Sequence, residues 1–63
     1  MKLKELKPIL YSTRCNMTMG ILYDSSVDMD IESGCTVDYI IDKYGDKTVK
    51  QLQADNNCVV ITI

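Results

Sequence analysis

Hydrophobic and polar positions along the chain change their spacing several times, and each spacing predicts an element. Near the start, apolar residues recur at the interval of one helix face, which predicts a short helix over residues 3–11. The apolar positions of this segment are Leu3, Leu6, Ile9 and Leu10. Pro8 is tolerated only in the first turn of a helix, because proline lacks the N–H and clashes with the turn before it. We therefore expect this helix to be kinked or to begin late.

The next segment alternates with a period of two, which is typical of strands with one buried face. Residues 14–24 and 27–33 are predicted as two strands of an antiparallel hairpin, joined by the turn residues Asp24, Ser25 and Ser26. Gly20 marks a bulge or a close backbone approach in the first strand. The predicted buried side consists of Cys15, Met17, Met19, Ile21, Tyr23, Val27, Met29 and Ile31.

A second helix is predicted over residues 37–44. Thr36 is placed to accept a backbone N–H as N-cap, and Gly45 suits a left-handed position after the helix. Asp38 lies near the positive end and Lys43 near the negative end of the helix dipole. The apolar positions are Val37, Ile40, Ile41 and Tyr44.

The C-terminal part predicts a second hairpin. Residues 58–63 are rich in β-branched side chains, with Val59, Ile61 and Ile63 on one side. Asp55, Asn56 and Asn57 form the expected turn, because asparagine tolerates positive φ. Residues 48–54 fit either a helical turn or a strand, and the hairpin context favours the strand.

Taken in order, the elements predict one α+β domain over residues 1–63. We expect a small antiparallel sheet of about four strands, made of two hairpins, with two short helices and the order α-β-β-α-β-β. A chain of 63 residues buries only about 60% of the surface that its unfolded form exposes. Small cores often need a partner subunit, and outer strands offer unpaired edges, so we also expect a homodimer.

Composition and charge remove several function classes. The net charge is −2 and Arg14 is the only arginine, so binding to nucleic acid is disfavoured. Neither a long apolar segment nor a signal peptide is recognisable, and we expect a cytoplasmic protein without a membrane span. Cys15, Cys35 and Cys58 form no CxxC pair, and the chain has no histidine. They are interpreted as small half-buried hydrophobes in a reducing compartment, and no cofactor or metal is predicted.

The stretch VDMDIESG, residues 27–34, holds the candidate functional residues. Acidic side chains two apart on a strand emerge about 6.6–7 Å apart, which is too far for a shared cation without further ligands. The acids are therefore interpreted either as the solvated face of a strand or as a negative surface for a basic patch on a partner protein. The candidate partner surface is Asp24, Asp28, Asp30 and Glu32.

Catalytic motifs are not found in the sequence. It contains no Ser/His or Cys/His pair, no glycine-rich phosphate loop and no HExxH. We predict no catalytic residue and no enzyme activity.

Three segments resemble short proteins encoded by bacteriophages, prophages and other mobile elements of Firmicutes. These are the opening MKLKEL, the strand end ILYD and the terminal stretch DNNCVVITI. Pro8 and TVKQLQ depart from that group's leucine-rich opening and more apolar third strand. The resemblance implies a small accessory protein of the host bacterial cell that binds and blocks a host protein, such as a defence protein. The alternative is a nucleic-acid-linked regulator or an acidic mimic of nucleic acid.

Overall fold

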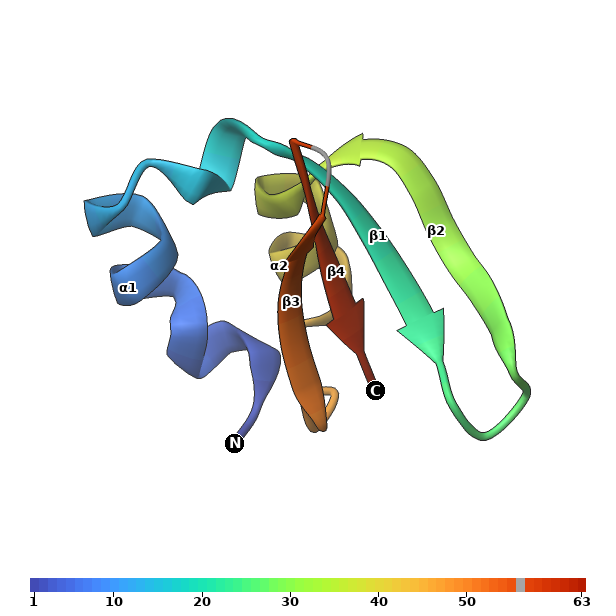
Figure 1. Cartoon of the computed structure of the whole chain (residues 1–63). Coiled ribbons are helices and arrows are strands. Elements are labelled where there is room, and N and C mark those ends of the chain that lie inside the picture. Colours follow the sequence, from blue (N-terminus) through green and yellow to red (C-terminus); the bar gives the residue numbers. More distant parts are fainter. Residues whose placement is uncertain (56) are drawn as a thin grey trace.

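The computed structural model describes residues 1–55 and 57–63 and contains a four-stranded sheet with helices packed on one face (Figure 1). The segment before the sheet forms two 3-10 turns and one short α-helix. Its elements are η1 (Leu3–Leu6), α1 (Lys7–Ser12) and η2 (Cys15–Met17). The remaining elements are β1 (Met19–Asp24), β2 (Met29–Thr36), α2 (Val37–Tyr44), β3 (Gln51–Asp55) and β4 (Cys58–Thr62).

The strand order in the sheet is β2-β1-β4-β3. Strands β1 and β2 form one antiparallel hairpin, and β3 and β4 form the other. The predicted α+β class with two hairpins is confirmed. The hairpins join through β1 and β4, which run parallel in the centre of the sheet. Parallel neighbours require a crossover connection, and α2 provides it between β2 and β3.

The first helix is divided, as Pro8 suggested. Residues 3–6 form η1, and α1 begins at Lys7, which places Pro8 in its first turn. Leu3, Leu6 and Leu10 are buried, whereas Ile9 is 56% exposed. The prediction of Ile9 on the apolar side is wrong because a 3-10 turn has three residues instead of 3.6, so the face shifts where the α-helix begins.

The prediction of a strand from residue 14 is also wrong. Arg14 adopts a left-handed conformation with a φ of 62°, and residues 15–17 form η2. Strand β1 begins only at Met19, and Met17 is 71% exposed. The carbonyl of Thr18 accepts a hydrogen bond of 2.9 Å from the Val37 N–H, which ties this turn to the start of α2. This tertiary contact outweighs the local alternation.

The buried side of β1 is opposite to the predicted one. Gly20 and Leu22 are buried, while Met19 is 46% exposed and Ile21 is half-buried. A Cβ atom built on Gly20 would lie 2.8 Å from Ile40 Cδ1, so the missing side chain lets α2 lie directly on β1. Side chains alternate along a strand, and this contact places the even-numbered residues of β1 on the helix side. The odd-numbered residues therefore lie on the opposite face of the sheet.

The predicted buried side of the second strand fails for a related reason. Val27 lies in the turn rather than in a strand, and both Val27 and Met29 are 56% exposed. Ile31 alone of these residues packs against the core, as a half-buried side chain. Strand β2 lies at the sheet edge, where α2 covers only its C-terminal part (Figure 1).

The core lies between the sheet, α2 and the N-terminal helices. The predicted apolar side of β4 is confirmed, and the predicted helix face of α2 supplies three fully buried residues and the half-buried Tyr44. The buried core consists of Leu3, Leu6, Leu10, Leu22, Val37, Ile40, Ile41, Val59, Ile61 and Ile63.

The ends of α2 follow the sequence in part. Thr36 is the N-cap, and its Oγ1 accepts a hydrogen bond of 3.2 Å from the Tyr39 N–H. Gly45 ends the helix with a φ of −54°, so its predicted left-handed conformation is wrong. A side chain at Gly45 would lie 2.9 Å from the Ile41 carbonyl oxygen and 3.2 Å from Lys4 Cβ, so space rather than φ favours glycine there.

The favoured strand interpretation of residues 48–54 is confirmed over residues 51–54 by β3, whose side chains are all exposed. In the expected turn, Asn57 has a positive φ of 66°. Asn56 lies outside the described residues.

Leu22 and Ile21 offer a direct test of which face of β1 is buried. Leu22→Ala should lower the free energy of unfolding by about 2–5 kcal/mol, because it leaves a cavity in the core. Ile21→Ala should cost only about 1 kcal/mol, since that side chain is half-buried outside the core. Urea unfolding followed by circular dichroism compares the two. A larger loss for Ile21→Ala would contradict the face assignment.

Candidate functional site

The face of the sheet opposite the helices carries a set of mostly apolar side chains that no described helix covers. Strands β1 and β4 run side by side there, and their residues pair as Met19 with Cys58, Ile21 with Val60, and Tyr23 with Thr62. These residues alternate with the buried Gly20, Leu22, Val59 and Ile61, so they point away from α2. We call this set the open face: Met19, Ile21, Tyr23, Cys58, Val60 and Thr62.

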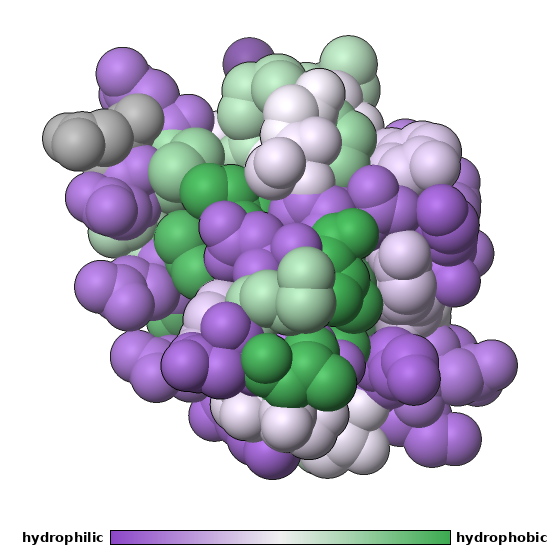
Figure 2. Space-filling view, turned by 90° about the vertical axis from the view of Figure 1, so that its right-hand side faces the viewer, coloured by the Kyte–Doolittle hydropathy of each residue, from purple (hydrophilic) through white to green (hydrophobic). Residues whose placement is uncertain are grey.

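Acidic residues border the open face on both sides. On the β2 side, Asp30 lies opposite Tyr23, and the Tyr23 hydroxyl donates a hydrogen bond to Asp28 Oδ1. On the β3 side, Asp55 lies opposite Cys58. We call Asp28, Asp30 and Asp55 the acidic rim. Within residues 1–55 and 57–63, none of them forms an ion pair with a lysine or arginine. Figure 2, seen from the β2 side, shows apolar side chains gathered at the surface with hydrophilic ones between and around them.

The predicted acidic surface does not form one ladder. Asp28 lies in the turn with a φ of 55°, and β2 begins only at Met29. Asp30 lies opposite Tyr23, but Glu32 lies opposite the buried Leu22. The register shifts between these two pairs, so an extra residue of β2, Ile31, separates Asp30 from Glu32. Such a bulge turns Glu32 toward the helix side of the sheet.

Asp24 has a local role at the end of β1. Its Oδ1 accepts hydrogen bonds from the Ser26 N–H at 2.9 Å and the Ser26 hydroxyl at 2.6 Å. These bonds favour the charged form and lower the pKa of Asp24. The carboxylate therefore shapes the β1–β2 turn, as the turn chemistry of the sequence predicted.

Glu32 connects β2 to α2. Its Oε2 accepts hydrogen bonds of 2.9 Å from both Lys43 Nζ and the Tyr44 hydroxyl. The bond from Lys43 lowers the pKa of Glu32, with a further contribution from Tyr44. The same contacts raise the pKa values of Lys43 and Tyr44. Of the predicted acids, Asp28 and Asp30 thus remain beside the open face, whereas Glu32 links β2 to α2.

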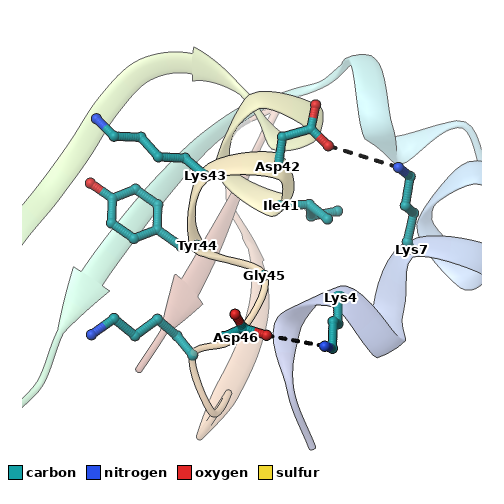
Figure 3. Close-up of a pocket in the computed structure, with 9 residues that line it drawn as sticks. Lys4, Lys7, Ile41, Asp42, Lys43, Tyr44, Gly45 and Asp46 are labelled. Atoms are coloured by element: carbon teal, nitrogen blue, oxygen red, sulfur yellow. Dashed lines mark ion pairs between the residues drawn. The ribbon is translucent and has the colours of Figure 1, made fainter.

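A hollow of about 510 Å³ lies between the N-terminal helices and the C-terminal end of α2 (Figure 3). Lys4 Nζ lies 3.0 Å from Asp46 Oδ1, and Lys7 Nζ lies 3.8 Å from Asp42 Oδ1. The two ion pairs cross the hollow and join the N-terminal segment to the end of α2 (Figure 3). We assign a structural role to these charged side chains, because their ion pairs connect the two segments.

The cysteines and acids do not assemble into a cluster. In the part of the chain that the structure describes, no group of three or more such side chains is placed to hold a metal ion, and the three cysteines are free. Cys15 and Cys35 pack against the core. Burial raises the pKa of the Cys35 thiol. Cys58 belongs to the open face, where its Sγ lies 2.8 Å from the Asp55 carbonyl oxygen.

The sequence contained a signal for the open face that alternation alone did not reveal. Residues 19–23 read MGILY, with apolar side chains on both sides of the strand. Such a run fits a strand with two apolar faces. Gly20 then decides which face lies against a helix.

The pH dependence of stability tests the role of Glu32. Its folded-state pKa lies below the ordinary value of 4.5, so its contribution is present above about pH 4.5 and is lost as the pH falls through the folded-state pKa. Glu32→Gln should lower the free energy of unfolding at pH 7. It should also make the decrease of this free energy between pH 5 and pH 2.5 smaller than in the wild type. Asp24 and Asp46 also have lowered pKa values, so part of the loss should remain.

Urea unfolding at a series of pH values measures this effect. Asp30→Asn is the matched control, because it removes a carboxylate from the same strand without removing an ion pair. If the free energy of unfolding of Glu32→Gln depends on pH in the same way as that of the wild type, the link between β2 and α2 contributes nothing to stability.

Comparisons with family models, curated proteins and solved structures give no match to this chain. In the described residues, no helix has the length and apolar character needed to cross a membrane. The open face and its acidic rim are therefore interpreted from their own geometry.

Proposed function

We propose that the chain is a non-catalytic protein-binding module that contacts its partner through the open face. The observation that carries this proposal is an apolar sheet surface, two strands wide, that no described helix covers. Contiguous apolar patches on small proteins mark interaction sites, because exposing them to water costs free energy that a partner recovers. Met19, at 46% exposed, and the half-buried Tyr23 are residue types that interfaces favour.

The acidic rim favours a partner whose contact surface is positively charged. Asp28, Asp30 and Asp55 border the apolar centre and lack ion-pair partners in the described residues. A partner surface with an apolar ridge flanked by lysine or arginine would satisfy both parts of the site. The ion pairs of the described residues lie elsewhere on the molecule and involve three of the seven basic residues of the chain. They join Lys4 to Asp46, Lys7 to Asp42, and Lys43 to Glu32.

The biological role that we propose follows from the resemblance of the sequence. A small accessory protein of a bacteriophage or mobile element would act inside the host cell by covering a working surface of a host protein, such as a defence protein. Occlusion needs no catalytic group, and a continuous sheet face suits it because neighbouring strands can be buried together.

The alternative, an acidic mimic of nucleic acid or a nucleic-acid-linked regulator, has less support. A mimic needs closely spaced charges, since duplex DNA carries one charge per about 1.7 Å. Asp28 and Asp30 lie beside the open face, but Glu32 is paired with Lys43 and turned to the helix side. The remaining acids surround an apolar centre, which suits a protein partner better.

A double substitution of the open face tests this function. Ile21→Thr together with Val60→Thr keeps β-branched residues in both strands and removes apolar surface. Immobilised protein should capture a partner from a Firmicutes lysate, and the double variant should bind that partner about tenfold or more weakly, because two apolar contacts are lost.

Ile9→Thr is the matched control, since Ile9 is an isoleucine 56% exposed on α1, away from the open face. It should leave binding of the captured partner unchanged. Equal binding by the double variant would place the interface elsewhere on the molecule. Failure of the wild-type chain to capture any protein would contradict the binding function.

A further inference from the structure

The two edges of the sheet differ in how well they could pair with another strand. Strands β2 and β3 are the edge strands, and each has a neighbour on one side only. Unpaired N–H and C=O groups along such edges favour addition of a further strand. Proteins protect edges with charges, bulges and covering segments, and the two edges carry these features unequally.

Strand β2 is protected. Its pairing with β1 shifts register twice, and Gly34 adopts a φ of 73° within the strand. Bulges bend a strand and increase its twist, so its outer edge is not a regular template. Asp30 adds negative charge to it, whereas the charge of Glu32 is balanced by Lys43. Antiparallel self-pairing of β2 would bring like charges close together, which is unfavourable.

Strand β3 has less of this protection, because its charged residue, Asp55, lies at its C-terminal end. Its register with β4 is regular from Gln51 to Asp55, and all five side chains are exposed. It contains no lysine, proline or glycine. Among the described residues, the backbone hydrogen bonds from the N-terminal segment to this edge lie before the strand. There the Val49 N–H donates to the Met1 carbonyl at 2.8 Å, and the Leu3 N–H donates to the Lys47 carbonyl at 2.9 Å.

We propose that the edge of β3 pairs with β3 of a second copy of this chain, in antiparallel register centred on Gln53. This register places Gln51 opposite Asp55, Leu52 opposite Ala54, and Gln53 opposite Gln53 of the other copy. No like charges face each other. The Gln51 amide meets a carboxylate that can accept its hydrogen bond. Leu52, which is 43% exposed in the single chain, gains an apolar neighbour.

Pairing in this way extends the sheet to eight strands. The two-fold axis of an antiparallel pair is perpendicular to the sheet, so the open faces of both copies lie on the same side. The dimer therefore presents two open faces and two acidic rims as one surface. The contact of five residues on each side is small compared with the roughly 20–30 residues of a standard interface, so dimerisation is reversible and depends on concentration.

Charge substitutions at the two-fold axis test this pairing. Gln53→Lys and Gln53→Glu each place like charges opposite each other, and each should weaken association about fivefold. A mixture of the two variants should associate at least as tightly as the wild type, because opposite charges then meet. Sedimentation equilibrium of the purified chain up to about 1 mM measures association without any partner protein.

Met29→Lys is the control, since it adds a charge to the other edge strand and should leave association unchanged. Concentration-dependent amide shifts in NMR spectra should concentrate at residues 51–55. A monomer at every concentration, failure of the mixture to associate, or shifts confined to β2 would overturn the proposal. The open face could still bind its partner as a monomer, so either inference can fail without the other.

Discussion

The fold depends on one close contact, the approach of α2 to β1 at Gly20. A side chain on Gly20 would lie 2.8 Å from Ile40 Cδ1 and 3.1 Å from Val37 Cγ2, so only glycine allows the helix to lie flat on this strand. The contact selects which face of β1 is buried. Through the parallel pairing of β1 with β4, it also aligns Leu22 with Ile61 in the core.

The same contact creates the candidate binding surface. Strand β1 has apolar side chains on both faces, and only one face can lie against α2. The other face, with Ile21 and Tyr23, therefore meets water together with Val60 of β4. A larger protein could cover such a face with a second layer of helices. The helices of the described residues all pack on the other side, so within this part of the chain the open face is available to a partner.

The acidic residues of β2 lie on two different sides of the sheet because the strand is bulged. Asp30 stays beside the open face, whereas the extra residue Ile31 turns Glu32 toward Lys43 and Tyr44. One carboxylate therefore fastens the edge strand to α2, and its neighbour two positions earlier remains without an ion pair among the described residues. The bulge that makes this division also protects the β2 edge, which leaves β3 as the regular edge of the sheet.

The sequence by itself determined the elements whose signals are local. Signals of this kind, which depend on neighbouring residues, are the Thr36 cap, the helix face with Val37, Ile40 and Ile41, and the β-branched alternation of β4. Another is Pro8, which lies in the first turn of α1 because this helix begins late, at Lys7. The α+β class and its two hairpins followed from the order of these elements. Tertiary structure decided the rest. The parallel pairing of β1 with β4 joins residues about 40 positions apart, as Met19 with Cys58, which no local pattern encodes. The buried face of β1 and the position of Glu32 were also decided there, because a helix contact and a bulge each reverse the alternation on which the sequence prediction relied.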